Sequence, residues 1–313
     1  MKQVLIQKGI AKVIDVPSPK IGKGEVLVAV QASTISIGTE VAEIKNSGDS
    51  LYSKALKQPE KVLQTINHTY EFGFKNTYDL IKNKEREFTP TGYSCSGIVV
   101  DVSPEIKDIC IGQRVACCGS KYAFHAEFIR VPRNLCVPFS KDINFNFAST
   151  VSLGAIALQG IRRAQPSLGE LFVVIGLGFL GQLTVQLLKA NGCRVIAIDK
   201  DISRVNKAIE MGINYASQDE NDLLIKSKEI SSNIGADAVI ITASSLSDSI
   251  VSQAFKLCRK KGRVVLVGDV GLNLKRDDFY KNEIDFLISC SYGPGRYDSE
   301  YEEKGVDYPI GYV

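Results

Sequence analysis

Residues 171–199 constrain the fold more than any other stretch of the chain. Their sequence is LFVVIGLGFLGQLTVQLLKANGCRVIAID. A short apolar run predicts a buried strand, glycines follow at Gly176, Gly178 and Gly181, and an amphipathic helix and a second apolar run lead to Asp199. In this pattern the first glycine turns the chain, the second lets backbone approach a pyrophosphate, and the third lets helix and strand pack closely. The stretch predicts a βαβ unit that binds a dinucleotide, the alternative being a glycine turn without a nucleotide.

The start of the predicted helix and the end of the second strand complete the expected cofactor site. Phe179 and Leu180 begin the helix, whose free N–H groups and positive dipole end favour phosphate. The Asp199 carboxylate is placed to accept hydrogen bonds from the adenosine ribose. The negative charge of Asp199 would repel the 2′-phosphate of NADP(H), so the sequence favours NAD(H) over NADP(H). Lys200 and Arg204 are nearby cations that could weaken the preference for NAD(H). The alternative is that they are only solvent-exposed residues at the start of a helix.

The composition is that of an ordinary globular protein. The 313 residues suffice for two domains, with 44% hydrophobic and 23% charged residues. The net charge of +3 gives no reason to expect nucleic acid or an anionic membrane as a partner. No stretch approaches the roughly 20 apolar residues of a membrane span, and the first residues alternate instead of forming a signal-peptide core. We therefore expect a cytoplasmic protein that acts on a small molecule.

Eight cysteines are present, but none of them forms a CxxC pair. The chain has only two histidines, His68 and His125, and several cysteines lie in apolar strand patterns. This distribution favours buried free thiols in a reducing compartment over metal ligands or disulfides.

The first part of the chain alternates short strand patterns with turns rich in glycine and proline, which is typical of a small β-barrel-like domain. Its expected strands are 4–7, 13–16, 25–32, 97–102, 113–118 and 126–131, and lysine-rich helices are expected at 52–63 and 78–84. A helix over 147–163 joins this part to the nucleotide unit. The nucleotide unit then alternates helices at 202–211, 219–231 and 248–260 with strands at 214–216, 238–243, 264–267 and 286–289. Such alternation predicts an α/β fold with a doubly wound, six-stranded parallel sheet.

Several segments resemble the medium-chain dehydrogenase/reductase superfamily, the relatives of zinc alcohol dehydrogenases. The matches are GQRVACCG at 112–119, HAEFIRVP at 125–132, VIGLGFLGQ at 174–182 and SCSYG at 289–293. The resemblance implies a GroES-like β-rich substrate domain over residues 1–150, with a helical insert at about 43–90, and a Rossmann domain over residues 151–290.

A narrower resemblance is to the N-terminal half of bi-domain oxidoreductases of bacterial surface-polysaccharide clusters. It rests on SIGTE at 36–40, TGYSCSGIVV at 91–100, VPRNLCVP at 131–138 and the final segment from Tyr292. In that family a second oxidoreductase half follows, and superfamily members usually return to the N-terminal domain. We therefore expect residues 291–313 to be the start of a truncated return. The chain would then be a fragment, a truncated product or a protein completed by a second domain or chain.

The resemblance also implies that zinc is absent. The positions of the family's three zinc ligands are occupied here by Ile37, Tyr93 and the region near Val151, none of which offers a ligand. We therefore expect no metal, the alternative being an unorthodox site that uses His68 or His125.

Without a metal, a hydroxyl or an imidazole must relay the proton. Thr39 matches the family's relay hydroxyl, Tyr93 replaces a zinc ligand, and His125 lies on a segment that borders the family's substrate pocket. The structural alternatives are that Thr39 caps a helix beginning near Glu40, that Tyr93 is a half-buried aromatic, and that His125 is a satisfied turn residue. Glu40 either orients Thr39 or is a first-turn acid favoured by the helix dipole.

The sequence thus predicts a zinc-independent, NAD(H)-dependent oxidoreductase acting on an alcohol or carbonyl. The resemblance adds a sugar or sugar nucleotide as substrate, with a role in polysaccharide biosynthesis, and a homodimer paired through strand 286–289. Two alternatives stay open. One is a quinone-reductase-like enzyme, which Asp199 disfavours because such enzymes usually prefer NADPH. The other is a catalytically silent nucleotide-binding module completed by another polypeptide.

Overall fold

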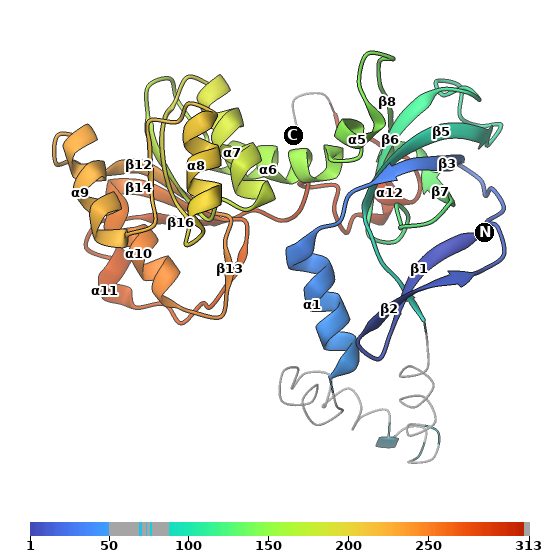
Figure 1. The fold of residues 1–313 in the computed structure, drawn as a ribbon, viewed down its shortest axis with the longest axis horizontal. Helices are drawn as coiled ribbons and strands as arrows, with labels where there is room; N and C mark the ends of the chain where they lie inside the picture. The colour runs from blue at the N-terminus through green and yellow to red at the C-terminus, as the bar shows by residue number, and fades with distance from the viewer. Residues whose placement is uncertain (50–68, 71–72, 74–75, 77–87, 310–313) are drawn as a thin grey trace. The chain divides into compact units, whose positions relative to one another are not determined.

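The structure is a computed structural model that describes residues 1–49, 69, 70, 73, 76 and 88–309. The chain divides into two compact units (Figure 1). Unit 1 comprises Met1–Ser152 and Ser299–Asp307, and unit 2 comprises Leu153–Asp298 and Tyr308–Val313. The helices predicted at 52–63 and 78–84, most of the predicted insert and His68 lie outside the described residues.

Unit 2 contains a six-stranded sheet in which every pair of neighbouring strands is parallel. The spatial order is β11-β10-β9-β12-β14-β16, so the strand order reverses between β9 and β12. This is the doubly wound arrangement that binds dinucleotides at the reversal point, and it confirms the predicted fold class. The strands are β9 (Leu171–Ile175), β10 (Arg194–Ile198), β11 (Tyr215–Ser217), β12 (Ala236–Ile241), β14 (Cys258–Leu266) and β16 (Asp285–Ile288).

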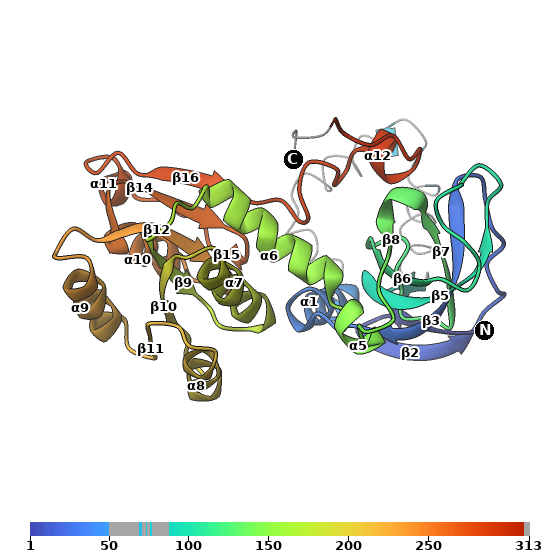
Figure 2. The same ribbon diagram turned by 90° about the horizontal axis from the view of Figure 1, so that it is seen from above.

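Helices cover both faces of this sheet because its central strand buries side chains on both sides (Figure 2). Phe172 and Val174 of β9 pack in one core with α6 (Val151–Ala164), α7 (Phe179–Ala190) and α8 (Ile202–Glu210). The alternate residues of β9 pack in a second core with α9 (Glu220–Ile230) and α10 (Ser249–Leu257). Smaller elements of unit 2 are β13 (Ser244–Ser245), β15 (Asp269–Val270) and α11 (Arg276–Phe279).

Unit 1 is built on antiparallel strands. One sheet has the order β2-β1-β4 and the other β7-β3-β5-β6-β8, with a bridge between Gln3 and Ala126 connecting β1 to the segment before β7. The strands are β1 (Lys2–Gln7), β2 (Ile10–Asp15), β3 (Glu25–Ser33), β4 (Thr89–Pro90), β5 (Ser94–Val102), β6 (Arg114–Cys118), β7 (Phe128–Pro132) and β8 (Cys136–Pro138). Helices α1 (Ile37–Gly48), α5 (Phe145–Ala148) and α12 (Ser299–Glu302), and the 3₁₀ helix η1 (Arg133–Leu135), complete the unit.

Two predicted helix boundaries are wrong. The helix expected over 147–163 is split into α5 and α6, because the Ser149 carbonyl accepts a hydrogen bond from Ser94 Oγ at 2.5 Å and Ser149 Oγ pairs with Thr34 Oγ1 at 2.7 Å. These contacts compete with helical hydrogen bonds. The helix expected to continue to residue 260 ends at Leu257, since Cys258 is extended and already pairs with Ala236 in the sheet.

Candidate functional site

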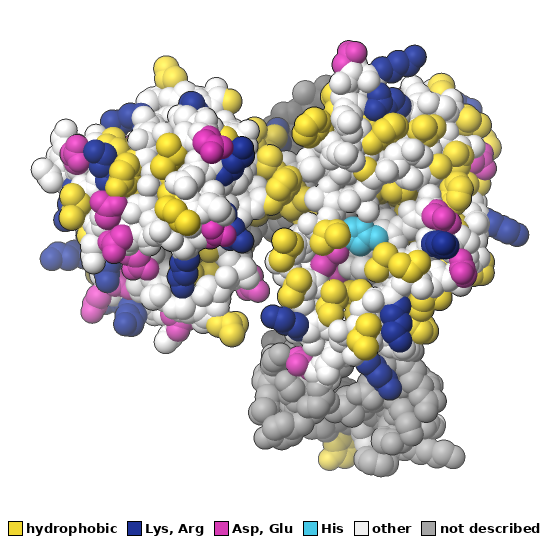
Figure 3. All heavy atoms as spheres, in the orientation of Figure 1, with side chains coloured by type: hydrophobic (Ala, Val, Ile, Leu, Met, Phe, Trp, Pro, Cys, Tyr) yellow, Lys and Arg dark blue, Asp and Glu magenta, His cyan; other side chains and the backbone are white. Residues whose placement is uncertain are grey.

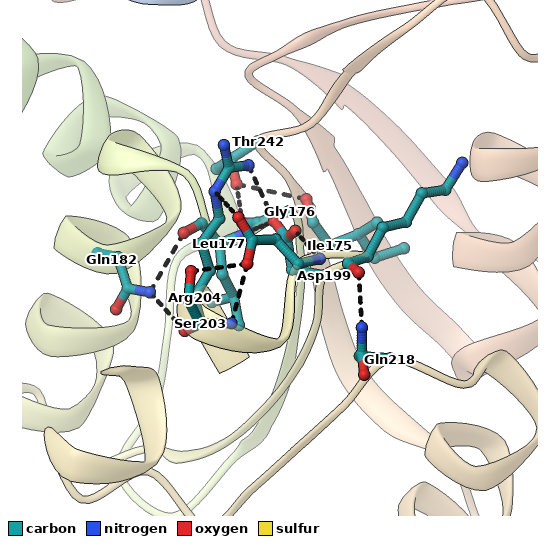
Figure 4. Close-up of polar contacts among 11 residues, drawn as sticks. Ile175, Gly176, Leu177, Gln182, Asp199, Ser203, Arg204, Gln218 and Thr242 are labelled. Atoms are coloured by element: carbon teal, nitrogen blue, oxygen red, sulfur yellow. Dashed lines mark hydrogen bonds and ion pairs between the residues drawn. The ribbon is translucent and has the colours of Figure 1, made fainter. Parts of the chain in front are cut away.

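The glycines of the predicted cofactor site lie where β9 is followed by α7: Gly176 and Gly178 are in the turn, and Gly181 is in the first turn of the helix. Figure 4 shows the polar contacts around Gly176. Gly176 has a φ of 96°, and a Cβ there would lie 2.7 Å from the backbone nitrogen of Ala243. A Cβ on Gly181 would lie 1.9 Å from the carbonyl oxygen of Gly176. Both glycines are therefore required by close backbone contacts within the chain.

Gly178 is different, because a Cβ there would meet no atom of the surrounding chain within 4 Å. Its φ of −62° is also accessible to any residue, so packing gives no reason for glycine at this position. Close approach of a pyrophosphate to the backbone does give one. Gly178 is the N-cap of α7, and Phe179 and Leu180 begin the helix, where N–H groups lack helical partners. The turn therefore fits a dinucleotide.

Asp199 follows β10 and is bonded to the glycine turn. Its Oδ2 accepts a hydrogen bond from the backbone N–H of Leu177 at 2.6 Å, and its Oδ1 accepts one from the N–H of Asp201 at 2.9 Å. The side chain is only 9% exposed. A carboxylate oxygen accepts up to two hydrogen bonds, so Asp199 both shapes the turn and keeps the capacity to bind ribose hydroxyls.

Of the two cations predicted beside Asp199, Arg204 forms an ion pair with its carboxylate and Lys200 is exposed. Arg204 is on α8, with Nη1 3.6 Å from Asp199 Oδ2 and Nε 3.5 Å from Asp201 Oδ2, and its side chain is half exposed. Lys200 is exposed, and its backbone carbonyl accepts a hydrogen bond from Gln218 Nε2 at 2.6 Å. The structure thus brings Arg204, by an ion pair, to the Asp199 carboxylate.

Sequence reasoning missed two residues that support the turn. Thr242, directly after β12, donates its hydroxyl to the carbonyl of Gly176 at 2.6 Å. Gln182 on α7 donates through Nε2 to the carbonyls of Leu177 at 3.2 Å and Arg204 at 2.8 Å. Thr242 could have been predicted from the sequence, because it stands at the carboxyl end of a strand. The carboxyl ends of neighbouring parallel strands meet at one edge of the sheet, which places Thr242 beside the turn after β9.

The residues predicted for catalysis all lie in unit 1. Thr39 is in the first turn of α1, Tyr93 precedes β5, and His125 precedes β7. The hydroxyls of Ser36 and Thr39 lie near enough to the Tyr93 phenol to lower its pKa, so the structure brings Tyr93 and Thr39 into one neighbourhood.

The surroundings of Tyr93 keep its phenol protonated. Burial is the main cause that raises the pKa of Tyr93, and the negative charges of Glu40 and Glu43 add to it. The neighbouring hydroxyls of Ser36 and Thr39 act in the opposite direction without reversing the shift. A phenol in this state suits the role of proton donor better than that of base.

His125 is bonded through both of its ring nitrogens. Nε2 lies 2.9 Å from Glu40 Oε2, and Nδ1 lies 2.8 Å from Ser33 Oγ. Together Ser33, Glu40 and His125 form what we call the His125 cluster. The side chains of His125 and Glu40 are 9% and 7% exposed, whereas Ser33 is exposed. Sequence reasoning missed Ser33, and no local pattern marks it.

The structure changes the interpretation of Thr39 and Glu40. Helix α1 begins at Ile37 with Ser36 as its N-cap, so the alternative in which Thr39 caps the helix is wrong. Glu40 Oε1 accepts a hydrogen bond from the backbone N–H of Ser36 at 2.7 Å. Glu40 therefore stabilises the helix start with one oxygen and contacts His125, rather than Thr39, with the other.

In the part of unit 1 that the structure describes, the pair of Glu40 and His125 does not by itself make a catalytic zinc site. Glu40 and His125 are two side chains capable of binding metal, whereas such a site takes three protein ligands. Among the residues that the structure describes, no group of three or more His, Cys, Asp or Glu side chains is arranged to hold a metal ion.

Comparison with known proteins places these features in context. The family model for zinc-binding dehydrogenases matches residues 180–304. The chain is 23% identical over 206 residues to an alcohol dehydrogenase of Geobacillus stearothermophilus, which covers 56% of this chain and 60% of that protein. It is 28% identical over 255 residues to L-threonine 3-dehydrogenase of Bacillus subtilis, which covers 81% of this chain and 71% of that protein.

Solved structures match over most of the chain. Galactitol-1-phosphate dehydrogenase from Escherichia coli has a TM-score of 0.73 at 19% identity, covering 93% of this chain and 83% of that one. A mycobacterial protein complexed with NADPH has a TM-score of 0.71 at 15% identity, and the match covers 93% of this chain and 82% of that one.

The two units therefore have the fold of a GroES-like domain and a Rossmann domain, the combination found in nicotinamide-dependent oxidoreductases. The family-model match, the dehydrogenase relatives and the shared fold support the medium-chain dehydrogenase/reductase superfamily.

On the face shown in Figure 3, acidic and basic side chains are interspersed in each unit, without a one-sided basic patch. None of the helices within the described ranges is both long enough and apolar enough to cross a membrane.

Proposed function

We propose that the protein is an NAD(H)-dependent oxidoreductase that transfers hydride to or from an alcohol or carbonyl without zinc. The observation that carries the proposal is the Asp199 carboxylate at the end of β10, bonded to Leu177 in the turn and adjoining the open backbone at Gly178. Its negative charge favours a ribose 2′-hydroxyl over a 2′-phosphate.

When bound, the nicotinamide cofactor supplies the hydride chemistry. The chain's own residues then hold and move the proton. Tyr93, whose pKa is raised by burial, donates a proton to a carbonyl oxygen, and the neighbouring Thr39 hydroxyl helps to orient the phenol. In the reverse direction the Tyr93 oxygen takes the proton back from the alcohol, and His125 serves in the exchange of protons with solvent.

A sugar or polyol is the proposed substrate class. It is supported by the fold match to galactitol-1-phosphate dehydrogenase and by the resemblance to enzymes of polysaccharide clusters.

Fluorescence titration with NADH and NADPH tests the cofactor. The key variant is Asp199→Asn, because the amide oxygen can still accept the hydrogen bond from the buried Leu177 N–H, while the charge and the bond from the exposed Asp201 N–H are removed. We expect NADH to bind the wild type at least about tenfold more tightly than NADPH, and the Asp199→Asn variant to show a ratio near one. Arg204→Gln is the matched control, and NADH binding should survive it.

The alternative outcomes are informative. Tighter binding of NADPH, weakened by Arg204→Gln, would mean that Arg204 accommodates a 2′-phosphate and would favour the quinone-reductase-like alternative. Binding of neither nucleotide would contradict the proposal and favour the silent docking module. Zinc independence is tested separately, since turnover of a polyol screen should be unaffected by a chelator and by added zinc.

A further inference from the structure

The His125 cluster determines which ring nitrogen of His125 exchanges protons. A carboxylate can only accept hydrogen bonds, so the nitrogen that faces it must carry hydrogen. His125 Nε2 faces Glu40 Oε2 at 2.9 Å. In the neutral imidazole the other nitrogen, Nδ1, is then the acceptor, and the Ser33 hydroxyl at 2.8 Å donates to it.

The surrounding backbone holds this arrangement in place. Glu40 is only 5% exposed, and its second oxygen is bonded to the N–H of Ser36 at 2.7 Å, which prevents the carboxylate from turning away. The backbone N–H of His125 donates to the carbonyl of Thr91 at 3.0 Å. A Cβ on Gly92 would lie 3.0 Å from both Cδ2 and Nε2 of the ring, so the imidazole packs directly on the glycine backbone.

We infer that Glu40 is a positioning residue that holds His125 as the Nε2–H tautomer, so that Nδ1 exchanges protons with solvent through Ser33. The inference rests on the proposed function, in which one proton is released or taken up with each hydride. Ser33 passes its hydroxyl proton to Nδ1 and accepts another at Oγ from its exposed side. The imidazolium that results faces the negative charge of Glu40.

Nitrogen-15 NMR of histidine-labelled protein tests the tautomer directly. The chain has two histidines, and a His68→Gln variant assigns the signals that remain to His125. The spectrum is recorded in alkaline buffer. We expect Nε2 to be protonated and Nδ1 to be a bare acceptor.

Glu40→Gln should reverse the tautomer. The glutamine oxygen still accepts from Ser36, which turns the amide NH₂ toward Nε2 and leaves the ring proton on Nδ1. Glu43→Gln is the matched control, because it removes a carboxylate one turn away, on the same helix, that bonds Thr91 instead of His125. It should leave the tautomer unchanged. An Nδ1–H or doubly protonated ring in the wild type, or an unchanged tautomer in a folded Glu40→Gln variant, would overturn the inference.

A kinetic measurement separates this inference from the proposed function. Ser33→Ala should keep the Nε2–H tautomer but lower kcat by about tenfold or more without changing KM, since only the proton path is removed. If the wild type shows no activity, the proposed function fails while the NMR result still decides the tautomer. An unchanged kcat in Ser33→Ala would overturn the role of Ser33.

Discussion

The backbone N–H of Leu177 and the carboxylate of Asp199 are joined by a hydrogen bond of 2.6 Å. Leu177 is fully buried between two glycines of the turn, and Asp199 follows the neighbouring strand. The acid predicted to bind ribose therefore also satisfies a buried donor of the glycine turn. The proposed cofactor preference and the shape of the turn depend on the same side chain.

We predict that Asp199→Ala destabilises the protein even without nucleotide. Removing the acceptor leaves the buried Leu177 N–H unsatisfied, which costs about 1–3 kcal/mol. Asp199→Asn keeps an acceptor and should cost clearly less. Urea denaturation of the nucleotide-free protein measures both, and equal stability of Asp199→Ala and the wild type would contradict the dual role.

Alanine substitutions at Gly181 and Gly178 should separate an effect on stability from an effect on NADH binding. Gly181→Ala places a Cβ 1.9 Å from the Gly176 carbonyl oxygen, so we expect a loss of more than about 2 kcal/mol of stability together with loss of NADH binding. Gly178→Ala meets no surrounding atom, so its stability should change by less than about 1 kcal/mol while NADH binding falls at least about tenfold.

Thermal denaturation and NADH titration of the two glycine variants check this contrast. A Gly178→Ala protein that binds NADH as the wild type does would mean that no phosphate approaches the backbone at that position.

The nucleotide unit was largely predictable because its signals are local. Between β9 and β10 the apolar runs, the glycine spacing and the terminal Asp199 lie within one short stretch, and each follows from backbone sterics. The splitting of the helix expected over 147–163 was not predictable, because it depends on hydrogen bonds of Ser149 with Ser94 and Thr34, which are distant in the sequence.

The His125 cluster was also beyond local sequence reasoning. His125 is 85 residues from Glu40 and 92 from Ser33, and only the packing of α1 and β3 against the segment before β7 brings the three together. The sequence marked His125 and Glu40 as separate candidates, and the pairing between them came from tertiary structure.

Glu43 should make stability depend on pH. Burial raises the pKa of Glu43 and the charge of Glu40 raises it further, while a hydrogen bond from Thr91 opposes the shift. A raised pKa in the folded state means that stability is greatest below the ordinary glutamate pKa of about 4.3 and falls as the pH rises through the folded pKa.

Glu43→Gln should therefore be more stable than the wild type at pH 7 and equally stable near pH 4. The gain should stay below about 1 kcal/mol, because Glu43 is only partly removed from water, which screens its charge. Urea denaturation at the two pH values measures it. A wild type that is the more stable of the two at pH 7 would show that the Thr91 hydrogen bond outweighs burial.

The cysteines should react according to their burial. All eight carry free thiols, of which Cys110 and Cys290 are exposed. Burial raises the pKa of Cys258 to about 12, and a thiol attacks alkylating reagents only as the thiolate. At pH 8, iodoacetamide followed by peptide mass spectrometry should show early labelling of Cys110 and Cys290, with Cys258 labelled only after unfolding. Cys117 and Cys136, buried with their sulfur atoms 3.9 Å apart, should follow Cys258, and rapid labelling of either would contradict the packing of β6 against β8.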